Sequence, residues 1–270
     1  MNALKFNAAM EYIESLLRFA ELLAEKARLE TLKPFRQNAS VEIKADASPV
    51  TVADRNSEAA MREMIAGAYP THGVIGEEFG ADTAASQLWI LDPIDGTRSF
   101  ISGSPMYCTL IGFVQNGKPL IGLIDMPALN ERWLGVNSAV ESFATFNGRP
   151  CHVAANTALA GAIMATTTMG LTDDERNAAL LRLSRLSAHT RLGGDAEAYG
   201  SVAGGFVNLA ADYEMQAYDY LPLAPIVLAA GGQMTDWRGR RLILKSGKCE
   251  TLASADKTLH EEALTVLAFS

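Results

Sequence analysis

Residues 89–97 read Trp-Ile-Leu-Asp-Pro-Ile-Asp-Gly-Thr, an apolar run that leads directly into two carboxylates, a glycine and a hydroxyl. The apolar residues are typical of a short buried strand, which we expect Pro93 to end. A tight turn there would aim Asp92 and Asp95, together with the Ile94 carbonyl, into one pocket. Oxygen ligands of this kind suit Mg2+, which retains waters and commonly shares its shell with a substrate phosphate.

The end of the same stretch adds groups that bind anions. Gly96 and Thr97 place backbone N–H groups where a helical turn is expected to begin. Such a terminus attracts negative charge. The stretch therefore predicts a site where a metal ion and a phosphate group meet.

Composition restricts the class of protein. The chain has 270 residues, is 49% hydrophobic and carries a formal net charge of -8. It is long enough for one large domain or two coupled halves with a substantial core. The negative charge and the lack of a Lys/Arg run argue against a nucleic-acid-binding surface.

The charged N-terminal segment resembles neither a signal peptide nor a membrane span, so we expect a cytoplasmic protein. Cys108, Cys151 and Cys249 lack the paired spacing of zinc or redox motifs, and we expect reduced thiols.

Hydrophobic periodicity predicts an α/β protein. Up to residue 150 we expect an α+β half that holds most of the metal ligands, and over 151–270 an α/β half. The expected helices are 4–32, 53–69, 173–187, 196–210, 221–230 and 256–268. The expected strands are 72–76, 89–91, 107–114, 120–126, 132–136, 162–167 and 189–192, with short strands near Met234 and Leu242. Asn116-Gly117 is a strong hairpin signal.

Two further acidic motifs lie far from residues 89–97 in the sequence. Gly76-Glu77-Glu78 follows a short apolar strand, so a third acid from a different strand would complete a cation cage. The alternative is that both glutamates solvate a loop. Asp219 follows Tyr218 and precedes an apolar helix, where the simplest function is an N-cap. An N-cap aspartate can also ligate a metal through its other oxygen.

Four motifs, in order, resemble the inositol monophosphatase family of Mg2+-dependent, lithium-sensitive phosphatases. They are Pro49-Val50-Thr51-Val52-Ala53-Asp54, Gly76-Glu77-Glu78, Asp92 to Thr97, and Tyr218-Asp219 with Ala230-Gly231-Gly232. The resemblance covers nearly the whole chain. It implies the sugar-phosphatase fold, a layered α-β-α-β-α sandwich, and hydrolysis of a small phosphate monoester. Because family members are often homodimers, we expect a homodimer.

The resemblance also implies a role for each motif residue. Glu77, Asp92 and the Ile94 carbonyl would hold the first Mg2+, and Asp92, Asp95 and Asp219 the second, with a weaker third ion near Glu77. Two such metals can clamp the attacking and leaving oxygens of an in-line displacement.

The nucleophile implied by the resemblance is a metal-bound water. Thr97 with Asp54 resembles the dyad that helps activate it, with Glu77 on the other side; alternatively, Thr97 caps the following turn. The Gly96 and Thr97 N–H groups would hold phosphate oxygens. Lys44 falls near the family's mobile-loop lysine, and an ordinary surface lysine is an equal alternative.

Substrate choice is expected to depend on the second half of the chain. Gly193-Gly194-Asp195, followed by a Tyr-containing segment, resembles the histidinol-phosphatase branch and implies substrate contacts at Gly194, Asp195, Ala196 and Asp212. Histidinol phosphate carries an ammonium and an imidazole, which an acidic wall of Asp195 and Asp212 would pair with.

Several alternatives remain open at this point. Asp195 is equally suited to be a helix N-cap. Two residues depart from the pattern, since Asp212 stands where the family usually has glutamate and Ala196 where the branch has cysteine. Inositol 1-phosphate or another small sugar phosphate is the second substrate hypothesis. A non-catalytic phospholigand-binding homologue is a third hypothesis, which the intact acids and Thr97 argue against.

Overall fold

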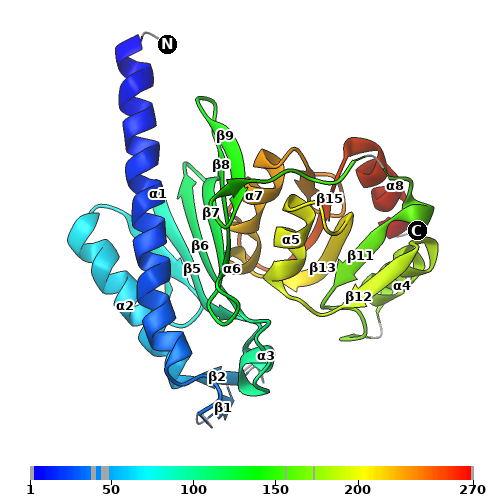
Figure 1. The fold of residues 1–270 in the computed structure, drawn as a ribbon, viewed down its shortest axis with the longest axis horizontal. Helices are drawn as coiled ribbons and strands as arrows, with labels where there is room; N and C mark the ends of the chain where they lie inside the picture. Colours follow the sequence, from blue (N-terminus) through cyan, green and yellow to red (C-terminus); the bar gives the residue numbers. More distant parts are fainter. Residues whose placement is uncertain (1–2, 38–40, 44–48, 156, 173, 269–270) are drawn as a thin grey trace.

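The protein is a layered α/β sandwich, as the sequence predicts (Figure 1). The computed structural model describes residues 3–37, 41–43, 49–155, 157–172 and 174–268. In chain order its helices are α1 (Ala3–Leu32), α2 (Val52–Ala68), α3 (Thr97–Ile101), η1 (Leu159–Gly161), α4 (Glu175–Leu186), α5 (Ala196–Ala203), α6 (Ala217–Tyr220), α7 (Leu223–Ala229) and α8 (Lys257–Leu267). No helix within the described ranges is both long and apolar enough to cross a membrane.

The larger sheet has eight strands in the order β10-β9-β8-β7-β6-β5-β3-β4. These are β3 (Gly73–Gly76), β4 (Gly80–Ala81), β5 (Gln87–Asp95), β6 (Cys108–Gln115), β7 (Lys118–Met126), β8 (Glu131–Asn137), β9 (Ser142–Phe146) and β10 (Arg149–Pro150). The turn between β6 and β7 confirms the hairpin prediction, since Asn116 and Gly117 both have positive φ, 52° and 75°. A separate two-stranded sheet pairs β1 (Val41–Ile43) with β2 (Pro49–Thr51).

We expected Pro93 to end strand β5, but the strand continues to Asp95. The register with β6 shifts between Asp92 and Asp95, so Pro93 and Ile94 oppose Thr109 alone. A bulge of this kind accommodates a proline, which cannot donate to the ladder. The Pro93 carbonyl instead accepts a hydrogen bond from Thr109 Oγ1 (2.8 Å). The bulge therefore lies between the two aspartates that the sequence predicts as metal ligands.

The smaller sheet has five strands in the order β12-β11-β13-β15-β14. These are β11 (Ile163–Thr166), β12 (His189–Leu192), β13 (Leu209–Met215), β14 (Gln233–Thr235) and β15 (Cys249–Ser254). The predicted helix 196–210 is too long, because α5 ends at Ala203 and a Gly204-Gly205 turn leads into β13. Leu242 lies beside an isolated bridge between Thr235 and Arg241, not in a strand.

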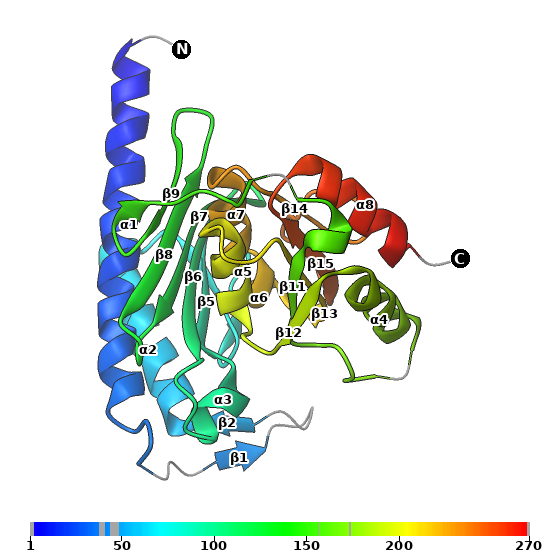
Figure 2. The ribbon, with the colours of Figure 1, turned by 45° about the vertical axis from the view of Figure 1, so that its right-hand side comes forward.

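Helices from the second half of the sequence form the layer between the two sheets, and α1 and α2 cover the outer face of the larger one (Figure 2). Helix α7 packs on β7 and β8. Glycines permit this close approach, because a Cβ on Gly122 would overlap the Pro222 carbonyl and one on Gly135 would overlap the Ile226 backbone. The segment that carries Asp219 is thereby fixed against the sheet that carries Asp92 and Asp95. The division of the chain at residue 150 stays a prediction.

Candidate active site

Three predicted metal ligands converge in the structure. One carboxylate oxygen from each of Asp92, Asp95 and Asp219 lies within 4.8 Å of the others. Two come from the bulged end of β5 and the third from α6. They line a cavity of about 220 Å3 with other predicted site residues, namely Glu77, Ile94, Gly96 and Thr97. The oxygen-only donor set is the type that hard divalent cations prefer.

The electrostatics of this cavity favour a bound cation. Burial, followed by the charges of Glu77 and Asp95, raises the pKa of Asp92 well above its usual value. Burial also raises the pKa of Asp95, as do the charges of Asp195 and Asp219. The pKa of Asp219 rises to about 7, again mainly through burial. A divalent cation would stabilise the ionised form of all three groups, so the residues present fit a metal ion.

Asp219 is not the N-cap that its sequence position suggested. It is the third residue of α6, and its Oδ2 accepts a hydrogen bond from the N–H of Gln216, the N-cap residue (2.7 Å). Its carboxylate is thus anchored through one oxygen.

Glu77 immediately follows β3, and its N–H donates to the Leu91 carbonyl (3.2 Å). A buried residue of α2, Glu58, holds the next turn by accepting hydrogen bonds from Glu78 N–H (2.7 Å) and Phe79 N–H (3.2 Å). Sequence reasoning missed Glu58. The signal for it was a glutamate on the apolar face of a predicted helix.

Thr97 begins α3 but does not cap it, because Gly96 is the N-cap residue, with φ 80°. The Thr97 hydroxyl instead donates to the Ile94 carbonyl (3.0 Å). Asp54 is buried, and its Oδ2 accepts from the Thr51 N–H (2.8 Å) and hydroxyl (2.6 Å). Its Oδ1 has no hydrogen-bond partner among the described residues. Because the hydrogen bonds described for Thr97 and Asp54 involve other partners, their pairing as a dyad stays a prediction.

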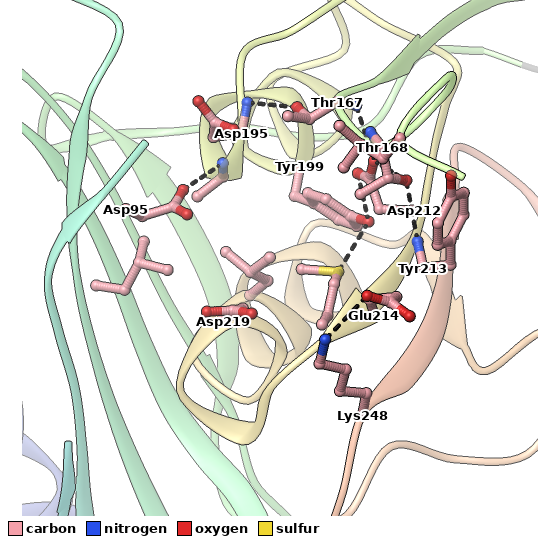
Figure 3. A pocket seen from close by; sticks show the side chains of 15 residues that line it. Asp95, Thr167, Thr168, Asp195, Tyr199, Asp212, Tyr213, Glu214, Asp219 and Lys248 are labelled. Atoms are coloured by element: carbon pink, nitrogen blue, oxygen red, sulfur yellow. Dashed lines mark hydrogen bonds and ion pairs between the residues drawn. The ribbon is translucent and has the colours of Figure 1, made fainter. Parts of the chain in front are cut away.

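A second cavity, of about 210 Å3, adjoins the first and shares Asp95, Asp219, Glu214 and Lys248 with it (Figure 3). Its remaining lining includes Asp195, Ala196, Tyr199 and Asp212. The structure therefore brings the predicted substrate residues Asp195, Ala196 and Asp212 beside the predicted metal ligands. Lys44 lies outside the described residues.

Asp195 occupies the N-cap position of α5, but its side chain makes no capping hydrogen bond. Its φ is 47°, and its N–H donates to Thr167 Oγ1 (2.9 Å). The preceding Gly194 has φ 110°, a conformation that favours glycine. Burial, followed by the charge of Asp212, raises the pKa of Asp195 to about 6. A cationic group would stabilise its ionised form.

Asp212 is buried and strongly hydrogen bonded. Its Oδ1 accepts from the Thr166 hydroxyl (3.1 Å), the Thr167 N–H (2.8 Å), and the N–H and hydroxyl of Thr168 (both 2.9 Å). Its Oδ2 accepts from Tyr199 Oη (3.1 Å). These bonds fix the 166–168 segment against α5. A direct substrate contact by Asp212 stays a prediction.

Sequence reasoning also missed Glu214 and Lys248, which line both cavities. Lys248 Nζ lies 2.9 Å from Glu214 Oε2. The two residues are 34 positions apart in sequence. Neither residue belongs to a motif, so no local pattern indicates that they meet.

Comparison with known proteins identifies the family of the chain. A sequence model of the inositol monophosphatase family matches residues 13–270. The bifunctional phosphatase IMPL2 of Arabidopsis thaliana is 36% identical over 262 residues, covering 93% of this chain and 75% of that protein. A histidinol-phosphatase of Streptomyces coelicolor is 34% identical over 269 residues, covering 95% of this chain and 98% of that protein.

Solved structures share the fold. An inositol monophosphatase from Zymomonas mobilis superposes with a TM-score of 0.85 at 38% identity, covering 94% of this chain and 98% of that chain. An inositol monophosphatase from Thermotoga maritima superposes with a TM-score of 0.83 at 27% identity, covering 94% and 96%. The chain therefore belongs to the inositol monophosphatase family and is a phosphoric monoester hydrolase of this metal-dependent group.

Proposed function

We propose that this enzyme is a Mg2+-dependent histidinol-phosphatase that acts in histidine biosynthesis. One observation carries the proposal: a cavity with acidic walls directly adjoins the metal-binding cavity. A substrate with its phosphate at the metal ligands would extend its other end toward Asp195 and Asp212. Histidinol phosphate has an ammonium and an imidazole at that end.

Charge distinguishes this substrate from the inositol alternative. Asp195 is largely buried, and its raised pKa reflects the cost of keeping its negative charge there. An ammonium beside it would offset that cost through a charge-assisted hydrogen bond. The hydroxyls of inositol would form only neutral hydrogen bonds to it. The histidinol-phosphatase relatives support the first choice, while inositol 1-phosphate or another small sugar phosphate is the second candidate.

The residues at the metal-binding cavity have proposed roles in binding Mg2+, phosphate or water. Glu77, Asp92 and the Ile94 carbonyl would hold one Mg2+, and Asp92, Asp95 and Asp219 a second, with a weaker third beside Glu77. Bound Mg2+ supplies charge neutralisation at the phosphate and a more acidic bound water. The Gly96 and Thr97 N–H groups would orient the phosphate oxygens at the start of α3. Thr97 would orient the attacking water, and a carboxylate would receive the proton, either Glu77 directly or Asp54 by way of the Thr97 hydroxyl.

The assay that tests this proposal measures phosphate release with Mg2+ from histidinol phosphate, inositol 1-phosphate and fructose 1,6-bisphosphate. We expect the highest kcat/KM for histidinol phosphate. A higher value for inositol 1-phosphate would contradict the proposed substrate and leave the metal-dependent chemistry in place. Binding of ligands without turnover of any phosphate ester would favour the non-catalytic alternative, which the phosphatase relatives oppose.

We also propose that the enzyme is a cytoplasmic homodimer. The resemblance to the family supports the dimer, and the sequence composition supports the compartment. Light scattering of the purified full chain tests the dimer, with a monomer mass at assay concentration as the contradicting result.

A further inference from the structure

Lys248 is the one cationic side chain that lines the two adjoining cavities in the described part of the chain. Its ammonium lies 2.9 Å from Glu214 Oε2. Glu214 lies within a bulge in β13, where the register with β15 shifts between Asp212 and Met215. Glu214 and Lys248 line both the cavity of about 220 Å3 that holds Asp92, called here the metal cavity, and the cavity of about 210 Å3 that holds Asp195, called here the acidic cavity. The structure thus already contains one ammonium bound to a carboxylate where both cavities meet these side chains; Figure 3 shows the pair in the acidic cavity.

The other cation on Glu214 is held much more firmly. Arg176 contacts Glu214 Oε1 (3.0 Å) and also pairs with Asp174, and its guanidinium lies over the Tyr213 ring at 5.0 Å. The Arg176 side chain is 26% exposed, whereas that of Lys248 is 51% exposed and contacts only Glu214 among the ion pairs described. An exposed lysine pair of this kind is weak and easily exchanged.

The charges around Glu214 indicate which kind of substrate group could replace the Lys248 ammonium. Asp174 and Glu214 are balanced by Arg176 and Lys248, so the four side chains have no net charge. If the Lys248 ammonium moves away, Glu214 is left with one uncompensated negative charge. A substrate that brings one ammonium to Glu214 restores the balance, while a neutral substrate does not.

Glu214 is better placed than Asp212 to bind a substrate ammonium. Both oxygens of Asp212 already accept hydrogen bonds from the protein, and its side chain is buried. Glu214 borders both cavities, and its Oε2 is paired with a side chain that can swing away.

We propose that Glu214 binds the ammonium group of the substrate and that Lys248 holds the same position until substrate displaces it. This inference rests on the proposed function, because it requires a phosphate monoester with an amino group. Glu214 is then a specificity-determining residue, and Lys248 is an internal competitor for its carboxylate. The family's metal ligands take no part in the exchange.

The experiment compares Glu214→Gln and Lys248→Met in the Mg2+-loaded enzyme. Matched controls are Glu261→Gln and Lys257→Met, which break an exposed Lys–Glu pair on α8 (3.6 Å) that lines neither cavity. We expect Glu214→Gln to raise KM for histidinol phosphate, relative to KM for inositol 1-phosphate, by about tenfold, as for loss of a charge-assisted bond. Lys248→Met should lower KM for histidinol phosphate by about threefold, since the competitor it removes is a weak exposed pair. The control variants should match wild type.

Two results would overturn the inference. One is an equal change of KM for both substrates in Glu214→Gln. The other is a raised KM for both in Lys248→Met, which would mean that Lys248 binds the phosphate end.

Calorimetric binding of histidinol, which lacks the phosphate, separates this inference from the proposed function. If wild type prefers inositol 1-phosphate but binds histidinol in a Glu214-dependent manner, the proposed substrate is wrong and the ammonium site stands. If wild type prefers histidinol phosphate and Glu214→Gln changes neither the KM ratio nor histidinol binding, the ammonium site is wrong and the proposed function stands.

Discussion

The N–H of Ala196 donates a 2.7 Å hydrogen bond to Asp95 Oδ2. Ala196 is the first residue of α5, and Asp95 is the last residue of β5, 101 positions away. The first residue of α5, which lines the acidic cavity, thus holds the carboxylate of Asp95, which also lines the metal cavity. The contact links the part of the site that is expected to recognise the substrate to the part that is expected to perform the chemistry.

Replacing Asp95 with asparagine should remove activity without removing this link. The asparagine carbonyl can still accept the Ala196 N–H, whereas the negative charge of the proposed metal ligand is lost. We expect kcat/KM to fall by at least about a thousandfold, because metal stabilisation of transition-state charge is worth several kcal/mol. Phosphate release and the melting temperature are the measurements. Asp82→Asn, at an exposed position outside both cavities, is the control. More than a tenth of wild-type activity in Asp95→Asn would contradict the assignment.

Glu58 should control how well Glu77 binds metal. Its carboxylate accepts two backbone N–H groups of the turn after Glu77 and pairs with Arg62 (2.7 Å). Glu58→Gln weakens these charge-assisted bonds and leaves the turn less rigid. Outer partners of metal ligands typically contribute 10–100-fold in affinity, so the Mg2+ concentration for half-maximal activity should rise by about tenfold or more.

The matched control for Glu58 is Glu63→Gln, on the exposed face of the same helix. Calorimetric titration with Mg2+ checks the effect independently of turnover. An unchanged Mg2+ requirement in Glu58→Gln would show that the turn keeps its shape without this carboxylate.

Protons and metal should compete for the carboxylates that line the two cavities. Burial raises the pKa of Asp219 to about 7 and that of Asp195 to about 6. For a carboxyl group whose folded pKa is raised, its stabilising contribution is complete below the unfolded pKa near 4. It is lost as pH rises through the folded pKa. The protein without metal therefore loses stability from these groups between about pH 4 and 7, and Mg2+ should restore it.

The measurable quantity is the increase in melting temperature caused by Mg2+ relative to EDTA. We expect it to grow from pH 5 to pH 8 and to flatten in Asp219→Asn. Taking this difference removes the contribution of His260, whose pKa burial lowers to about 4 and which titrates with and without metal. A Mg2+ effect that is constant across this range would contradict the raised pKa values.

The motifs predicted the acids of the site because their spacing and their strand context are local. The bulge that carries β5 past Pro93 was not predictable, because it depends on Thr109 in the neighbouring strand. The apolar run from Ala196 fits a helix continuing to residue 210, and periodicity alone does not reveal the Gly204-Gly205 turn that ends α5 at Ala203. The N–H of Glu78 that Glu58 binds is 20 residues away and the lysine that Glu214 binds is 34 residues away, and periodicity contains no information on such contacts.

Close packing of α7 should be as necessary for the fold as the acids are for the site. Gly122→Ala would force a methyl group against the Pro222 carbonyl, which is backbone and cannot rotate away. We expect a loss of about 1–3 kcal/mol in the free energy of unfolding, the usual cost of overpacking. Gly67→Ala is the matched control. It lies within α2 with nothing within 4 Å of the added Cβ, so it should stabilise by about 0.5–1 kcal/mol through helix propensity. Urea denaturation measures both changes. Equal stability of the two variants would mean that α7 can shift away from β7, and the position of Asp219 would then not depend on this contact.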